Sequence, residues 1–202
     1  MTLMTSAATA KGERRRYALV CAAAELLCEG GFEAVSHRAV AERAHVPLAS
    51  TTYYFSSLDD LVEKAVEFLG AAEVAQLRDR VQALPRRRRG AEATADVLVD
   101  LLAADPTREE LISRYERYIA CARHPALRGV ERRLLKQRID AIAEAVGRSG
   151  RRVRSGMMTA LLYSFDGAVA SSLADDAGAP REYVRATLVD VIDVLAPVDA
   201  RV

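Results

Sequence analysis

The stretch AERAHVPLASTTYYF, residues 41–55, decides how the rest of the chain is interpreted. It starts in an amphipathic helix, passes through a turn that contains Pro47, and closes on two tyrosines and Phe55. Ser36 is a good N-cap for that first helix, because its hydroxyl can accept a hydrogen bond from an unpaired amide of the first turn. Pro47 suits the first position of a second helix, where the missing N–H costs nothing. The pattern predicts two short helices joined by a tight turn.

The second helix has only about seven residues, so it is too short to be stable alone. We expect it to be supported by Val46, Phe55 and the preceding helix, which carries Leu19 and Leu27. A short helix presented by two supporting helices is a helix-turn-helix.

The side chains of this short helix suit contact with DNA. Its first residues are small or medium-sized, so its backbone can lie close to the floor of a major groove. Ser50 and Thr52 can donate to a phosphate or a base edge, and Tyr53 and Tyr54 can donate to phosphate oxygens. The tyrosines could instead be core aromatics. Because Phe55 is the better candidate for burial, we expect at least one tyrosine to be exposed.

Residues 16–61, RYALVCAAAELLCEGGFEAVSHRAVAERAHVPLASTTYYFSSLDDL, resemble the N-terminal DNA-binding domain of TetR-type (TetR/AcrR) transcriptional regulators. The resemblance rests on an Arg-led first helix, Gly-Phe, the Ser-x-x-x-Val-Ala pattern, the turn and the Tyr-Tyr-Phe close. It implies a DNA-binding domain of three helices, followed by helices that dimerise and enclose a small-molecule pocket. With Arg38 added for its charge, the expected DNA contacts are Ser36, Arg38, Pro47, Leu48, Ala49, Ser50, Thr52, Tyr53 and Tyr54.

Two positions depart from the family pattern. His45 stands where the turn usually holds glycine, and histidine tolerates a positive φ better than most residues. Leu58 stands where the family often places a phosphate-contacting lysine, a loss that Arg38 or the arginines at 14–16 can offset. Residues 1–55 carry six basic and five acidic side chains, so we expect modest non-specific attraction to DNA.

Apolar residues recur at helical spacing along the whole chain, which predicts an all-α fold. Gly30-Gly31 and Leu84-Pro85 are expected helix ends. We predict a disordered lead-in over residues 1–10, a helix-turn-helix domain over 11–57, and a C-terminal helical ligand-binding and dimerisation domain over 58–202.

The last two helices are expected at roughly residues 153–174 and 181–195. The resemblance implies that they pair with their symmetry mates, and their small and apolar residues permit close approach; ordinary intramolecular packing is the alternative. The expected interface residues are Ala160, Gly167, Val184, Leu188, Val191, Ile192 and Leu195.

Ligand pockets are mostly apolar with a few polar groups. The candidate lining residues are Tyr115, Tyr118, Met157, Met158, Tyr163 and Asp166. Asp166 could instead cap or pair structurally, and methionine and tyrosine at helical spacing are often core residues. A mostly apolar ligand held near the helix that starts at Leu58 would tilt that helix and change the spacing of the two reading helices of a dimer.

Other classes of function find little support. Neither a catalytic triad, paired carboxylates nor metal-ligand spacing is visible, so we expect no enzyme and no metal or cofactor. The three cysteines fit buried thiols in a reducing cytoplasm. No run approaches ~18 apolar residues, so we expect no membrane partner.

The expected partners are an operator in double-stranded DNA, a second copy of the chain and a small-molecule effector, in the cytoplasm. A helical enzyme, a helical protein-interaction module and a constitutive DNA binder without a ligand remain alternatives. The basic run at residues 86–89 is either a solvated loop or an arm that contacts nucleic acid.

Overall fold

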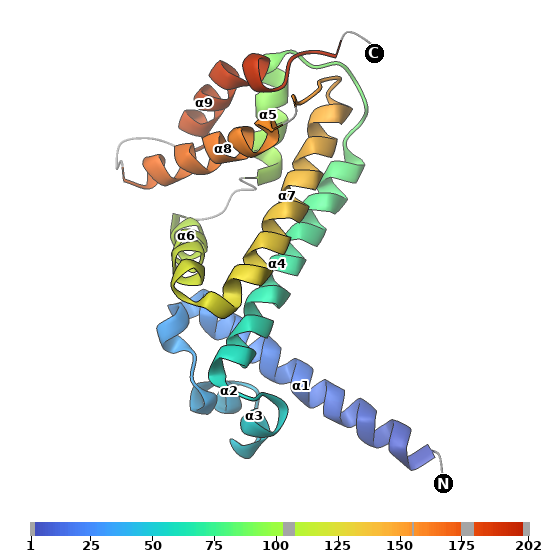
Figure 1. Ribbon diagram of the computed structural model, residues 1–202, viewed down its shortest axis with the longest axis vertical. Coiled ribbons are helices and arrows are strands. Elements are labelled where there is room, and N and C mark those ends of the chain that lie inside the picture. The colour runs from blue at the N-terminus through green and yellow to red at the C-terminus, as the bar shows by residue number, and fades with distance from the viewer. Residues whose placement is uncertain (1–2, 103–107, 155, 175–179, 200–202) are drawn as a thin grey trace. The chain divides into compact units, whose positions relative to one another are not determined.

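The computed structural model describes residues 3–102, 108–154, 156–174 and 180–199. Over these residues the chain is all-α, as the sequence predicts, with one isolated bridge between Arg151 and Val198 and no strand. The helices are α1 Leu3–Gly30, α2 His37–Arg43, α3 Ala49–Tyr54, α4 Leu58–Ala83, α5 Ala91–Leu102, α6 Arg108–Arg123, α7 Arg128–Arg148, α8 Met157–Leu173 and α9 Pro180–Leu195, with 3-10 turns η1 Phe32–Ala34 and η2 Pro125–Leu127 (Figure 1).

The chain forms two compact units. Unit 1 comprises Met1–Ala72 and Ser113–Leu134, and unit 2 comprises Glu73–Ile112 and Leu135–Val202. Unit 1 therefore includes residues beyond the predicted limit of the helix-turn-helix domain at residue 57, because Leu61 and Ala65 of α4 pack into the same core as α1. The functional division at residues 57 and 58 stays a prediction.

The core of unit 1 supports the helix-turn-helix. Leu19 and Ala23 of α1, Val40 of α2, Leu61 of α4 and the intervening Phe55 are fully or almost fully buried in one cluster. The helical members come from positions that repeat at helical spacing, so burial turns one face of each helix inward. The short helices are thus held by the supports that the sequence predicts.

Helix α1 begins at Leu3, whereas a disordered lead-in is expected over residues 1–10. Residues 3–10 contain leucine, methionine and three alanines but neither glycine nor proline. These are strong helix formers, so the helix continues toward the N-terminus.

Most helix ends lie where glycine and proline place them. Helix α1 ends at Gly30, and α4 ends just before Leu84 and Pro85. Helix α8 starts at Met157, four residues later than expected, because Gly156 adopts a left-handed conformation with φ 79°. A residue in that conformation cannot continue a right-handed helix.

In unit 2, α9 packs against α8 and against α5, and Figure 1 shows α8 and α9 side by side. The buried side chains include Leu98 of α5, Phe165 of α8 and Leu188 of α9. These contacts cover the inner face of α9 within the chain itself.

Candidate nucleic-acid interface

Helix α2 begins with the cap that the sequence predicts. Ser36 has extended backbone angles, and its Oγ accepts a hydrogen bond from the Ala39 N–H at 3.1 Å. The bond uses an acceptor site of the hydroxyl and leaves the O–H free to donate. Because Ser36 is exposed, that proton is available to a phosphate oxygen.

The turn between α2 and α3 is a Schellman motif closed by His45. The His45 N–H donates to the Glu42 carbonyl at 3.2 Å, and the Val46 N–H donates to the Ala41 carbonyl at 3.0 Å. His45 has φ 53°, the only positive φ of a non-glycine residue in the described part of the chain. The expectation that histidine replaces glycine without loss of the turn is confirmed.

Two buried side chains anchor α3 from its inner side. Thr51 has no exposed surface, and its Oγ1 donates to the Leu48 carbonyl at 2.8 Å. Phe55 is 2% exposed and lies in the core of unit 1. Thr51 lies between the expected DNA contacts Ser50 and Thr52, but its burial removes it from any contact surface.

The other residues of the stretch face solvent. Pro47, Leu48, Ala49 and Thr52 are exposed and Ser50 is half-buried, so the helix presents the small side chains that the sequence singles out. The Thr52 hydroxyl donates to the Ala49 carbonyl at 3.3 Å. Its oxygen therefore remains an acceptor toward a base edge.

The two tyrosines have different surroundings. Tyr53 is 80% exposed, whereas Tyr54 is half-buried, and their rings meet edge to face at 4.9 Å. A Cβ added at Gly12 of α1 would lie 3.6 Å from the Tyr54 hydroxyl, so this hydroxyl reaches α1. The prediction that Phe55 is buried and at least one tyrosine is exposed is confirmed.

Three arginines near this surface already contact carboxylates or an aromatic ring of the same chain. Arg38 donates to Glu42 at 2.9 Å, and Arg43 binds Glu29 at 2.7 Å and Glu25 at 3.3 Å. The hydrogen bond from Arg43 lowers the pKa of the Glu29 carboxyl. Arg16 lies 5.3 Å from the centroid of the Phe55 ring, a cation–π contact.

The start of α4 carries acidic rather than basic groups. Leu58 is half-buried against the core, and Asp59 and Asp60 follow it in the first turn. Ser57 and Asp60 cap the helix, because the Asp60 N–H donates to the Ser57 Oγ and the Asp60 carboxylate accepts from the Ser56 N–H, each at 3.1 Å. Helix α4 thus starts without the cation that the family often places there.

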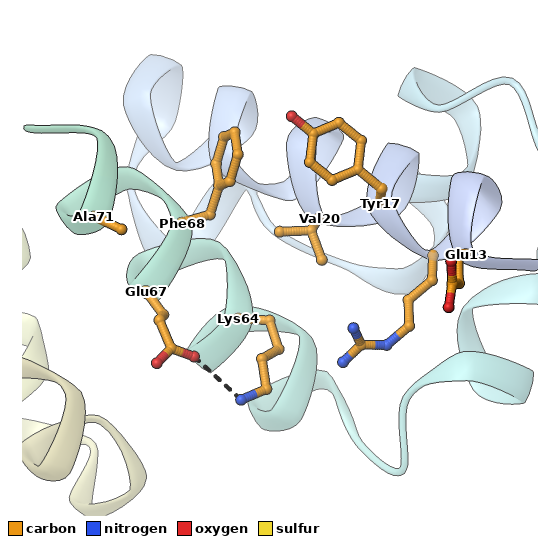
Figure 2. A pocket seen from close by; sticks show the side chains of 8 residues that line it. Glu13, Tyr17, Val20, Lys64, Glu67, Phe68 and Ala71 are labelled. Carbon is orange, nitrogen blue, oxygen red and sulfur yellow. Dashed lines mark hydrogen bonds and ion pairs between the residues drawn. The ribbon is translucent and has the colours of Figure 1, made fainter. Parts of the chain in front are cut away.

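A cleft of about 430 Å³ lies between α1 and α4 within unit 1. Figure 2 shows Tyr17 and Phe68 on one side and the Lys64–Glu67 ion pair, at 3.2 Å, on the other. The Tyr17 and Phe68 rings meet edge to face at 5.7 Å. Its lining residues are Glu13, Arg16, Tyr17, Val20, Lys64, Glu67, Phe68 and Ala71. The sequence did not single out these residues as a site, because a groove between two helices leaves no pattern different from that of a core face.

The predicted pocket residues belong to both units. Tyr115 and Tyr118 lie on α6 in unit 1, where their rings meet edge to face at 5.8 Å. The other four lie on α8 in unit 2: Met157, Met158, Tyr163 and Asp166. Asp166 accepts a hydrogen bond from Arg138 at 3.4 Å, which matches the alternative of a structural pair. Contact of these residues with a ligand stays a prediction.

Three predicted interface residues are buried within the single chain, which matches the alternative of intramolecular packing. Val184, Leu188 and Ile192 are at most 1% exposed within a single chain, so they have no surface left to bury against a partner. Of the other four, Ala160, Val191 and Leu195 are half-buried and Gly167 is exposed. The large apolar side chains that the same two helices expose include Tyr163, Tyr183 and Val194.

The structure shows the three cysteines as reduced thiols rather than disulfides. Cys121 is buried, and burial raises the pKa of its thiol to about 11. Cys21 is half-buried and Cys28 is exposed, so the expectation of buried thiols holds only for Cys121.

In the described ranges, histidine, cysteine and carboxylate side chains form no group of three or more that could hold a metal ion. Within those ranges, too, each helix is too short or too polar to cross a membrane.

Comparisons with known proteins agree with this geometry. The family model described as "Bacterial regulatory proteins, tetR family" matches residues 19–65, which include α2 and α3. The model described as "Tetracyclin repressor-like, C-terminal domain" matches residues 89–194. No curated protein matches the chain.

Several solved structures are similar over nearly their whole length. The multidrug binding protein EbrR in complex with imidazole is 31% identical, with 93% of this chain and 98% of that chain covered and a TM-score of 0.70. EbrR in complex with ethidium is 30% identical, with 88% and 98% covered and a TM-score of 0.64. A TetR family member from Streptomyces coelicolor A3 is 27% identical, with 88% and 97% covered and a TM-score of 0.61. The chain therefore belongs to the TetR family of DNA-binding transcriptional regulators.

Proposed function

We propose that the chain is a homodimeric repressor that binds a pseudo-palindromic operator through α3 and leaves it when a small, mostly apolar ligand binds. The observation that carries the proposal is the presentation of α3. Thr51 and Phe55 fix the helix to the core, while Leu48, Ala49 and Tyr53 face solvent. A rigid helix with small exposed side chains can enter a major groove closely. A regulator of this kind acts in the cytoplasm, where bacterial DNA lies.

The exposed residues divide into two roles. Ser36 and Tyr53 offer hydroxyl donors at the two ends of the α2–α3 pair, which suits contact with phosphates. Residues 47–50 and Thr52 lie between them and are assigned to the base edges. Tyr54 and Arg38 are weaker candidates, because the Tyr54 hydroxyl is near Gly12 and Arg38 is paired with Glu42.

We expect Tyr53→Ala to weaken binding to every duplex by a similar factor, because a phosphate contact carries no sequence information. A hydrogen bond to a charged group contributes roughly 1.5 kcal/mol or more, which corresponds to about tenfold in affinity. Fluorescence anisotropy with DNA from upstream of the gene and with a mixed-sequence duplex measures both affinities.

Tyr53→Phe is the matched control, because it keeps the ring and removes only the hydroxyl. It should lose nearly as much affinity as the alanine variant. Ser50→Ala should change the ratio between operator and mismatched sites instead. Parent-like binding by both Tyr53 variants would refute the assigned role.

The related EbrR structures support a ligand of the proposed kind. EbrR is described as a multidrug binding protein, and its complexes hold imidazole, proflavin or ethidium. We therefore propose that the helices after residue 57 hold a flat, mostly apolar aromatic molecule.

Proflavin or ethidium should raise the melting temperature of the protein alone and lower its operator affinity in the same concentration range. Linkage requires that the ligand favour the state that does not bind DNA. A coupling free energy of ~1–3 kcal/mol would lower operator affinity about 5–150-fold.

Because these dyes also bind duplex DNA, an unrelated DNA-binding protein on the same duplex serves as the control. If a dye releases both proteins, it acts by binding the DNA and not by binding this protein. A thermal shift without release from the operator would favour a constitutive DNA binder.

A two-fold protein suits a two-fold operator, since each subunit then reads one half-site. We assign the subunit interface to the exposed side of α8 and α9, where Tyr163, Tyr183 and Val194 lie. Gly167 and the half-buried Ala160 of α8 also allow a second helix to approach closely.

A further inference from the structure

Unit 2 brings together two basic loops that are far apart in the sequence. Residues 84–90, LPRRRRG, follow α4, and residues 148–154, RSGRRVR, include the end of α7 and the loop after it. Together they hold eight arginines and no acidic residue. The Arg87 N–H donates to the Arg148 carbonyl at 3.0 Å, and the Arg89 N–H donates to the Ser149 carbonyl at 3.1 Å. We call this joined surface the arginine patch.

Arg89 holds the two loops together from inside. Its side chain is 6% exposed and donates to the Pro85 carbonyl at 3.1 Å and to the Arg148 carbonyl and Ser149 Oγ, each at 3.3 Å. Its Nε has no hydrogen-bond partner, and no described carboxylate pairs with it. Because a guanidinium stays protonated in proteins, this buried charge adds to the positive potential of the patch.

The outer arginines are exposed and also lack carboxylate partners in the described part of the chain. Among the described residues, carboxylates pair with only two of the eight arginines: Glu144 with Arg148 at 2.8 Å and Asp193 with Arg151 at 2.7 Å. The Arg88 guanidinium donates to the Asp199 backbone carbonyl, which carries no charge. The five exposed arginines are Arg86, Arg87, Arg88, Arg152 and Arg154.

We propose that the arginine patch is a second nucleic-acid contact surface, which binds the phosphate backbone of duplex DNA without reading its sequence. Guanidinium groups match phosphate oxygens in pairs of hydrogen bonds. Long exposed side chains on two surface loops suit an extended polyanion, and duplex DNA carries one charge per about 1.7 Å of its axis. A DNA-binding regulator is also surrounded by such duplexes. The surface contains no residue of α2 or α3, so it goes beyond operator reading.

The test measures the affinity of the full chain for a mixed-sequence duplex without an operator, by fluorescence anisotropy at salt concentrations between about 50 and 200 mM. Over this range, affinity that comes from phosphate contacts falls steeply as salt rises. The variant Arg87→Gln/Arg152→Gln/Arg154→Gln removes three exposed charges. It should bind at least about tenfold more weakly at the lower salt. Its slope of log affinity against log salt should be shallower by about 0.9 for each phosphate that the variant no longer neutralises.

The matched control is Arg78→Gln/Arg123→Gln/Arg132→Gln, which removes the same charge from exposed arginines outside the patch. It should keep the parent affinity within about twofold, a difference smaller than one phosphate contact would make. Circular dichroism of both variants checks that they fold.

Three results would overturn the proposal: parent-like affinity and slope in the patch variant, an equal loss in the control variant, or patch-dependent binding only to vesicles of phosphatidylglycerol and phosphatidylcholine. A protein that fails to bind operator DNA but shows patch-dependent binding to mixed-sequence duplex would refute the proposed repressor function and support this surface.

Discussion

Replacing Leu188 with glutamate should unfold unit 2 rather than produce a folded monomer. Leu188 has no exposed surface, and α9 packs on α5 and α8. Removing a buried leucine side chain costs ~2–5 kcal/mol, and an unpaired buried carboxylate adds several more. The sum is comparable to the whole stability of a domain, about 5–15 kcal/mol.

Far-ultraviolet circular dichroism and chemical denaturation measure this effect. Leu188→Met is the matched control, because it keeps volume and apolar character and should cost less than about 1.5 kcal/mol. If the glutamate variant melts like the parent and is monomeric, Leu188 lies at a subunit interface after all. Ile192→Glu should behave as Leu188→Glu does, since Ile192 is equally buried.

Glutamate at the exposed positions of the same helix should leave the fold intact and separate the subunits. Tyr183 is 55% exposed and Val194 is 63% exposed, so a charge at either position stays solvated in the single chain. In a two-fold interface each substitution occurs twice and places like charges near each other. Loss of one interface anchor costs about 2 kcal/mol or more, and the double variant loses two anchors on each subunit. Tyr183→Glu/Val194→Glu should therefore weaken dimerisation by more than about a thousandfold.

Light scattering gives the mass, and operator binding should fall with it, because a monomer reads only one half-site. Ile119→Glu is the matched control, since Ile119 of α6 is an exposed apolar residue outside α8 and α9. This variant should remain dimeric. A dimeric Tyr183→Glu/Val194→Glu protein would move the interface to another surface.

Local chemistry explains what could be predicted from the sequence. The Ser36 cap, the helix end at Gly30 and the turn at His45 depend on residues within a few positions of each other, and all are found in the structure. The burial of Phe55 also follows from the shortness of α3, which must be anchored to something.

The rest depends on contacts between distant segments. An apolar stripe such as that of α9 shows which face is buried but not whether the same chain or a second copy covers it. Helical spacing did not distinguish Thr51 from Thr52, although one is buried and the other exposed. The joining of residues 86–89 to the loop after α7 rests on backbone hydrogen bonds and on donation from the Arg89 side chain, and neither kind of contact follows from the spacing of apolar residues.

The attachment of the six-residue α3 to the core has a genetic consequence. Because Thr51 and Phe55 hold a helix that is not stable alone, a lesion in the core at Leu61 would impair operator recognition at least as much as the roughly tenfold loss expected from Tyr53→Ala. If the protein is the dimeric repressor proposed above, a screen for derepressed alleles should therefore recover both classes. Dominance would distinguish the two classes of allele. A Tyr53 allele yields folded subunits that form inactive mixed dimers with wild-type subunits, so it is dominant. A Leu61 allele yields chains that are degraded, so it is recessive.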